Sequence, residues 1–372
     1  MPKYFAFLTV LAFNVFLKER VDVAVIEVGI GGHVDYTNVL RKVPVVGITA
    51  LGLDHTSILG NTLAEIAEAK AGIMKPGCVA YTCGQPPEAM AVLRRVAAEC
   101  ECPLKIAPDC KNYDTQITLP VNLDVYKTNA SLAIQLAHAW MKFGKANLNS
   151  RNTVKSITSG KILIQNGIKE INSPYPMNID KTTNGVFDQL VTTVIPDETV
   201  AGLRECKWPG RYQVIHKDYA TFYLDGAHTV ESMEICANWF KTNSRSQQKF
   251  LIFSITGDRD ATVILSHLKN VSFDQIFFVI PSAYKMNNEN SDNYYINEKK
   301  DLMAKCHKLD TIWRKLDNDE DPNKICVLEC VSDALEVIQN KNSVDTPSVL
   351  VTGSLHLVGA ALTILDLTLR ED

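Results

Sequence analysis

The chain has 372 residues, of which 46% are hydrophobic, and a formal net charge of −4 at pH 7. A chain of this length usually divides its core between two domains, and a near-neutral charge without a basic run gives no electrostatic support for nucleic-acid binding. The ten cysteines contain no two pairs at zinc-binding spacing, and they fit a reducing compartment better than a disulfide framework.

The first segment, residues 4–17, is largely apolar and follows Lys3. It is too short to span a bilayer, and no small-residue cleavage site of the kind that ends a signal peptide follows it. Its apolar residues, among them Phe5, Leu8 and Ala12, recur at roughly helical spacing. This pattern predicts a buried helix rather than a membrane anchor.

Strand and helix patterns alternate through the first half of the chain. Apolar, largely β-branched runs predict strands at 21–28, 43–51 and 79–82, and helical patterns occupy 62–74, 88–100 and 129–143. This alternation is typical of a parallel sheet covered by helices. Residues 144–194 are rich in small and polar side chains, which predicts loops and short helices that lead to a linker near residue 203.

A second alternation begins after this linker. Strands are predicted at 221–224, 250–255, 275–280 and 348–352, and a helix at 229–240. The polar, Asn-rich run at 284–301 predicts a surface insertion. We therefore predict two α/β domains, residues 1–203 and 204–372.

Two side chains that can bind metal lie at the ends of successive predicted strands. Glu27 opens the run Glu-Val-Gly-Ile-Gly-Gly, whose spacing does not match the G-x-G-x-x-G dinucleotide fingerprint. His55 lies beside Asp54 after the next strand, and a histidine held by a carboxylate is a common metal ligand. Each residue alone fits a solvated strand end or helix cap equally well; together they favour a metal site.

Lys70 lies on the apolar stripe of the predicted helix 62–74, between Ala67 and Ile73. Burial disfavours an ammonium group, and the usual outcome is a side chain that reaches the surface. The alternative is a neutral amine that has added carbon dioxide to become a carbamate.

The second half opens with Trp-Pro-Gly-Arg, ending at Arg211, and continues with Asp225-Gly-Ala-His228 between a predicted strand and helix. An arginine can bind phosphate through two donors, and the N-terminus of a helix offers free N–H groups to an anion. Asp225 at the strand end can accept ribose hydroxyls or simply cap the helix. Residues 256–260 and 352–356 resemble ordinary surface turns.

In this order the motifs resemble those of folylpolyglutamate synthases, a family of the Mur-ligase superfamily, in its eukaryotic form. The matching runs are residues 53–60, 69–73, 208–211, 223–228, 256–260 and 353–359. The resemblance implies a Mur-ligase-like central ATPase domain followed by a Rossmann-like C-terminal domain. It also implies ATP-dependent addition of glutamate to the γ-carboxyl of tetrahydrofolate polyglutamates through an acyl phosphate.

The resemblance implies a role for each candidate residue. Glu27 and His55 match magnesium ligands, and Lys70 matches a carbamylated catalytic lysine. ATP contacts are implied for Arg211, Asp225 and Asn129, and a catalytic place near the phosphates for His228. The implied cofactors are ATP and Mg²⁺, with folate and L-glutamate as substrates. A monomer without nucleic-acid or membrane partners is implied, in the cytoplasm, the mitochondrion or both.

The sequence departs from the family pattern in two places. The family's G-x-x-G-K-[ST] phosphate loop occurs nowhere in the 372 residues, so the resemblance is to an N-terminally truncated member that lacks this loop and the first strand. Such a chain is expected to be poorly soluble and to add no glutamate measurably. The family's Gly and His-Gln ahead of Asn129 are also absent. The alternatives are an inactive relative that binds folate or a partner, a dihydrofolate synthase on the same scaffold and, with least support, a nicotinamide dehydrogenase.

Overall fold

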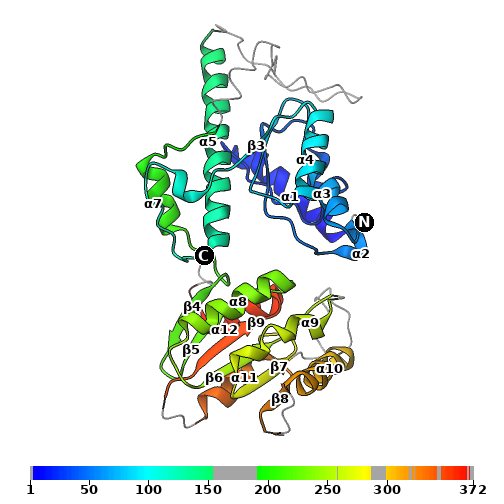
Figure 1. Ribbon diagram of the computed structural model, residues 1–372, viewed down its shortest axis with the longest axis vertical. Coiled ribbons are helices and arrows are strands. Elements are labelled where there is room, and N and C mark those ends of the chain that lie inside the picture. The colour runs from blue at the N-terminus through cyan, green and yellow to red at the C-terminus, as the bar shows by residue number, and fades with distance from the viewer. Residues whose placement is uncertain are drawn as a thin grey trace. The chain divides into compact units, whose positions relative to one another are not determined.

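The computed structural model describes residues 3–153, 191–257, 259–285, 299–317, 321, 323–341, 345–366 and 368. The chain divides into two compact units, Met1–Cys206 and Lys207–Asp372, with the division three residues beyond the predicted boundary at 203. Each unit holds a sheet with parallel strands and covering helices (Figure 1), which confirms the predicted α/β class. Within the described ranges, no helix is long and apolar enough to cross a membrane.

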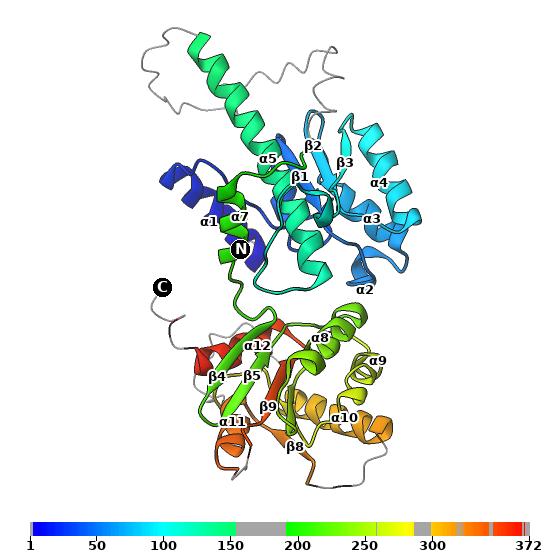
Figure 2. The same ribbon diagram turned by 60° about the vertical axis from the view of Figure 1, so that its left-hand side comes forward.

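A three-stranded parallel sheet in the order β1–β2–β3 forms the centre of the first unit. Its elements are β1 (Val45–Ile48), α2 (Thr56–Leu59), α3 (Leu63–Ala71), β2 (Val79–Thr82), α4 (Pro87–Glu99), β3 (Leu104–Ile106) and α5 (Asp124–Thr153). Alternate residues of β2 face opposite sides: Val79 and Tyr81 pack against α5, whereas Ala80 packs against α3 and α4. Figure 2 shows the sheet between α5 and these two helices.

Helix α3 begins at a cap that the sequence encodes. The Thr62 hydroxyl accepts a hydrogen bond from the Glu65 N–H (3.2 Å), and the Glu65 carboxylate accepts one from the Thr62 N–H (3.0 Å). This reciprocal pair satisfies two N–H groups that have no partner within the helix. The helix ends before Gly72, which places Lys70 in its last turn.

Two predictions for the N-terminal region were wrong. Residues 21–28 form no strand, and Val25 is 92% exposed; a β-branched run gains its strand preference only from a neighbouring strand and covered faces. Helix α1 (Tyr4–Glu19) confirms the predicted helix, but Thr9 is its only buried residue. Apolar side chains surround nearly the whole of α1, so their spacing could not define one buried face.

The segments between the predicted domains differ from simple loops. Helix α5 extends to Thr153, through the first residues of the predicted loop region, and α7 (Asp197–Glu205) occupies the predicted linker. Residues 154–190 of that region, and residues 286–298 of the predicted surface insertion, lie outside the described residues.

The second unit holds a six-stranded sheet in the order β4–β5–β9–β6–β7–β8, in which the β4–β5 pair alone is antiparallel. Its elements are β4 (Gln213–Lys217), β5 (Ala220–Leu224), α8 (Val230–Asn243), β6 (Lys249–Phe253), α9 (Ala261–Ser266), β7 (Gln275–Val279), α10 (Lys299–Asp317), β8 (Ile325–Leu328), α11 (Val331–Gln339), β9 (Ser348–Thr352) and α12 (Leu355–Leu365). All five residues of β7 and of β9 are buried, as expected for strands covered on both faces.

Strand order places several loops at one edge of this sheet. Strand β9 returns from the far end of the chain to lie between β5 and β6, parallel to both. The carboxyl ends of β5, β9 and β6 therefore lie together, and ligands of open α/β sheets bind at such an edge. Because β4 runs antiparallel to β5, with Gln213 opposite Leu224, the residues just before β4 reach the same edge.

Candidate functional site

The glycine run after Glu27 packs against the end of α3. A Cβ atom at Gly32 would stand 2.8 Å from the Ala69 carbonyl oxygen and 2.9 Å from that of Lys70, closer than a side chain tolerates. The next residue, His33, donates its N–H to the Ala69 oxygen (2.8 Å). Only glycine fits this approach, which fixes the loop beside the helix turn that carries Lys70.

The same loop also contacts the segment that follows His55. Gly31 has a φ of 71°, and a Cβ there would stand 2.8 Å from the Leu59 side chain of α2. The structure therefore brings together three segments that the sequence singled out: residues 27–32, 53–60 and 69–73.

Asp35 fastens this loop, a role that sequence reasoning missed. Its carboxylate accepts hydrogen bonds from the N–H groups of Ile30 (3.1 Å) and Thr37 (2.9 Å). An aspartate two residues before a threonine, at the end of a glycine run, is the available signal, since Asx side chains commonly bind the backbone two residues on.

The predicted metal ligands are accessible side chains. Glu27 is exposed, and His55, in the left-handed conformation (φ 52°), has a side chain that is 38% exposed with Nε2 3.5 Å from an Asp54 oxygen. Across the described part of the chain, no three His, Cys, Asp or Glu side chains form a metal-binding group. Mg²⁺ commonly takes one or two protein oxygens and completes its shell with water and phosphate, so the Glu27 carboxylate fits this ion. An imidazole such as that of His55 is a less typical magnesium ligand.

Asp225 is the only buried acidic residue in the part of the chain that the structure describes, at 2% exposure. It follows β5, and its two oxygens accept the N–H groups of Tyr212 (3.2 Å) and Ala227 (2.9 Å). Burial raises the pKa of Asp225 to about 6, although the positive charge of Arg211 and these hydrogen bonds oppose the rise. The carboxylate therefore holds both the turn before β4 and the turn before α8.

Arg211 lies against the backbone that follows Asp225. An ideal Cβ at Gly226 would stand 3.4 Å from Nη1 of Arg211, and it would overlap the Leu355 side chain on α12. Gly210, with a φ of 75°, packs equally closely on Val358 of the same helix. The Trp-Pro-Gly-Arg turn, the Asp225 turn and the start of α12 thus form one cluster.

His228 closes the turn before α8. Its Nδ1 lies 2.7 Å from the Gly226 carbonyl oxygen, and because a carbonyl only accepts, Nδ1 must carry the hydrogen. The helix behind it begins with a cap in which the Thr229 hydroxyl accepts the Ser232 N–H (3.2 Å). This arrangement fixes the ring orientation and leaves Nε2 as the acceptor nitrogen of the neutral ring.

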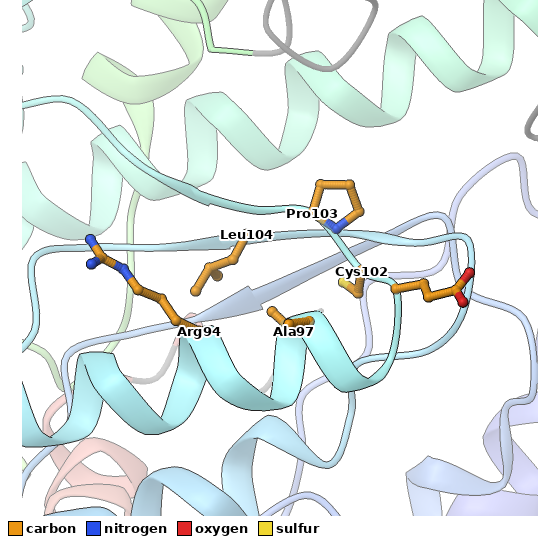
Figure 3. A pocket seen from close by; sticks show the side chains of 7 residues that line it. Arg94, Ala97, Cys102, Pro103 and Leu104 are labelled. Carbon is orange, nitrogen blue, oxygen red and sulfur yellow. The ribbon is translucent and has the colours of Figure 1, made fainter. Parts of the chain in front are cut away.

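Asn129 is an exposed residue in the second turn of α5. A depression of about 390 Å³ lies over α4 and the start of β3 (Figure 3). A second hollow, of about 580 Å³, is lined by Thr221 and Ser348 at the starts of β5 and β9, the edge opposite Asp225. No predicted site residue lines either hollow. Arg211, Asp225 and His228 lie at the carboxyl edge of the second sheet, opposite the second hollow.

Known proteins match this chain along its whole length. The family model for the dihydrofolate synthetase C-terminal domain matches residues 210–364. Bovine mitochondrial folylpolyglutamate synthase is 32% identical over 439 aligned positions, which include 100% of this chain and 71% of that protein.

Solved structures agree with the fold. Mycobacterium tuberculosis folylpolyglutamate synthase, complexed with ADP and AMPPCP, superposes with a TM-score of 0.66 at 22% identity, over 96% of this chain and 72% of that one. E. coli FolC, in complex with DHPP and ADP, gives a TM-score of 0.63 at 20% identity, over 100% of this chain and 72% of that one. The identity to the bovine protein, sustained over the whole chain, shows that this chain belongs to the folylpolyglutamate synthase family.

Proposed function

We propose that the protein catalyses ATP-dependent addition of glutamate to the γ-carboxyl of tetrahydrofolate and its polyglutamates. The observation that carries the proposal is the whole-chain similarity to folylpolyglutamate synthases at 32% identity. The cluster of Arg211, Asp225 and His228 at the carboxyl edge of the second sheet supports it, because nucleotides bind at such edges.

The reaction has two steps. A γ-carboxylate oxygen of the folate attacks the terminal phosphorus of ATP, and ADP leaves. The amine of a free glutamate then attacks the acyl carbon and loses a proton, and inorganic phosphate leaves. Both steps develop charge on phosphoryl oxygens, which positioned cations and N–H donors stabilise.

Residues of the second unit are assigned to the nucleotide. The Arg211 guanidinium supplies fixed positive charge and paired donors for phosphate oxygens. Asp225 holds the Arg211 turn through the Tyr212 N–H. Its carboxylate has further lone pairs beyond the two that accept backbone N–H groups, and these are assigned to the ribose hydroxyls. His228 is oriented by Gly226 to present Nε2. Asn129, on α5 of the first unit, is assigned to the adenine side.

Residues of the first unit are assigned to metal and charge. Glu27 and His55 would hold Mg²⁺, which supplies charge neutralisation at the phosphoryl oxygens. Lys70 is assigned as a carbamate. Carbamylation turns the cationic ammonium group into an anionic group whose oxygens can act as ligands on the metal side. The protein is proposed to act as a monomer in the cytoplasm, the mitochondrion or both; the bovine relative is a mitochondrial protein.

Dihydrofolate synthesis is a second candidate. The match of residues 210–364 to a dihydrofolate synthetase domain favours it. The two activities attach glutamate to different acceptors, so an assay with dihydropteroate and with tetrahydrofolate, each with labelled glutamate and ATP, separates them. We expect label in the tetrahydrofolate product alone.

The sequence contains no phosphate loop of the family type, so the assay includes a second protein. The chain is tested alone and after fusion to a segment that carries the family's G-x-x-G-K-[ST] phosphate loop. Turnover in the fused chain supports the proposal, and turnover in both shows that the 372 residues suffice. Absence of ATP-dependent turnover in both, while folate still binds, would favour the inactive relative.

A further inference from the structure

Two cysteine thiols touch inside the first unit, and none of the roles assigned above uses them. The Sγ atoms of Cys78 and Cys102 are 3.1 Å apart, and the residues are 1% and 2% exposed. All ten cysteines of the chain are free thiols. We propose that Cys78 and Cys102 form a reversible dithiol–disulfide pair that responds to peroxides, with Cys78 as the sulfur that is oxidised first.

The backbone already has the geometry of a cross-link. Ala80 and Leu104 are register partners on the parallel strands β2 and β3, and each cysteine lies two residues before one of them. The Ala80 N–H donates to the Pro103 carbonyl oxygen (2.9 Å), so the pairing continues to the strand starts. Adjacent strands lie about 4.8 Å apart, within the range of roughly 4.4–6.8 Å between the Cα atoms of a disulfide. This spacing is compatible with a disulfide, for which the two sulfurs would approach each other by about 1 Å.

Hydrogen bonding distinguishes the two sulfurs. Either thiol can donate across the pair, but the Lys75 backbone N–H donates to the Cys78 sulfur alone (3.3 Å). The Cys102 hydrogen bond, helped by the nearby Lys75 charge, lowers the pKa of Cys78 to about 7 although burial opposes this. The same hydrogen bond and burial raise the pKa of Cys102. Because the thiolate is the nucleophile, Cys78 reacts and Cys102 resolves.

The depression shown in Figure 3 reaches the pair at Cys102, and Cys78 is not among the residues that line it, so an oxidant that enters there must pass Cys102 to reach Cys78. The depression is lined by Arg94, Ala97 and Ala98 of α4 and by Cys102, Pro103 and Leu104 at the start of β3. The depression, of about 390 Å³, leaves room for hydrogen peroxide beside Cys102, whereas the near-complete burial of both sulfurs disfavours a peptide disulfide such as oxidised glutathione.

The chemistry balances with hydrogen peroxide as the oxidant. The Cys78 thiolate attacks one peroxide oxygen and the O–O bond breaks. Hydroxide leaves, and Cys78 is now a sulfenic acid. The Cys102 sulfur then attacks the Cys78 sulfur, its proton goes to the departing hydroxyl, and water leaves. Two thiols have lost two electrons and two hydrogens, and a dithiol reductant reverses the step by exchange.

The test is peptide mapping of the unmodified chain after hydrogen peroxide, with free thiols alkylated at low pH before digestion. We expect one new linked peptide that joins Cys78 to Cys102, lost on treatment with dithiothreitol. Since a disulfide restricts the unfolded chain, the oxidised protein should melt roughly 5–10 °C higher. Linkage of Cys100 to Cys102, or no linkage while exposed Cys206 is oxidised, would overturn the proposal.

Variants test the order of reaction. In Cys102→Ser, Cys78 should stop at the sulfenic acid and be labelled by dimedone, whereas in Cys78→Ser the Cys102 thiol should stay unlabelled. Cys83→Ser is the matched control, because Cys83 is also buried beside β2 but its pKa is raised by burial; it should leave the linkage unchanged. Equal dimedone labelling of Cys102 in Cys78→Ser would contradict the assigned order. If a variant fails to fold, the peptide map of the wild-type chain still tests whether Cys78 and Cys102 become linked.

Discussion

The backbone N–H of Tyr212 donates a hydrogen bond to the buried carboxylate of Asp225 at 3.2 Å. This bond joins the turn that carries Arg211 to the end of strand β5, thirteen residues further along the chain. Arg211 is therefore held at the carboxyl edge of the sheet by an acidic residue whose own burial is costly, and the two motifs act as one unit.

Replacement of Arg211 should weaken the use of ATP. Arg211→Lys keeps the charge but loses the paired donors, and a hydrogen bond between charged groups contributes about 1.5–3 kcal/mol. We expect kcat/KM for ATP to fall roughly 10- to 100-fold, with KM for glutamate little changed. Arg245→Lys is the control, since Arg245 lines the hollow at the opposite edge. Equal losses in both variants would remove Arg211 from the nucleotide site.

The raised pKa of Asp225 predicts a pH dependence of stability. In the folded chain this carboxyl keeps its proton up to a pH of about 6, whereas its ordinary value is 3.8. Between these values the unfolded chain releases a proton that the folded chain retains, so the contribution of Asp225 to the free energy of unfolding falls as the pH rises. The loss is about 3 kcal/mol when complete.

The measurement compares the wild type with Asp225→Asn, whose side chain does not titrate. The free energy of unfolding of the wild type minus that of the variant should decrease from pH 4 to pH 6.5. A difference that stays constant, or grows with pH, would show that Asp225 is ionised in the folded chain at low pH.

Gly226 should not tolerate a side chain, because a Cβ there overlaps Leu355. Overpacking of this kind typically costs about 1–3 kcal/mol, so Gly226→Ala should lower the free energy of unfolding by that amount. Leu355→Ala in the same chain should recover part of the loss. Gly359→Ala, on the same helix with nothing within 4 Å of its Cβ position, should instead stabilise by about 0.5–1 kcal/mol. If Gly226→Ala were neutral, the close approach would not exist in solution.

Lys70 should be carbamylated in the active protein. Labelled carbon dioxide should give a carbamate signal in the carbon NMR spectrum, and Lys70→Ala should lose both the signal and activity. Short-chain carboxylates should partly restore turnover by supplying the missing oxygens. Lys75→Ala, at another half-buried lysine beyond α3, should keep the signal. A carbamate signal that survives in Lys70→Ala belongs to another amine.

Removal of the metal-side ligands should affect rate more than folate binding. In the chain fused to the phosphate-loop segment, Glu27→Ala and His55→Ala should each lower kcat at limiting magnesium while KM for folate changes little, because both ligands act on charge that grows in the transition state. The exposed Glu88 on α4 provides the control Glu88→Ala, expected to behave as wild type. Since imidazole is the weaker match to Mg²⁺, the loss should be larger for Glu27 than for His55.

Local patterns predicted the regular elements where packing agreed with them. Strand β2 coincides with the predicted run 79–82, and α3 begins beside its encoded cap at Thr62. Residues 21–28 failed because a strand depends on a partner that local sequence does not specify. Gly32 contacts the end of α3, although the two segments are far apart in the chain. Local sequence patterns do not reveal such long-range contacts. The Tyr212 donor to Asp225 was missed because backbone groups carry no sequence signature.

The measurement that tests the central claim most directly is incorporation of labelled glutamate into tetrahydrofolate by the chain fused to the family's phosphate-loop segment, in parallel with its Arg211→Ala variant. The account predicts one ADP and one phosphate per glutamate added, no product without ATP, and at least a tenfold lower rate in the variant, on the scale of a lost charged hydrogen bond. Product that forms without ATP, or at equal rates in both proteins, would contradict the account.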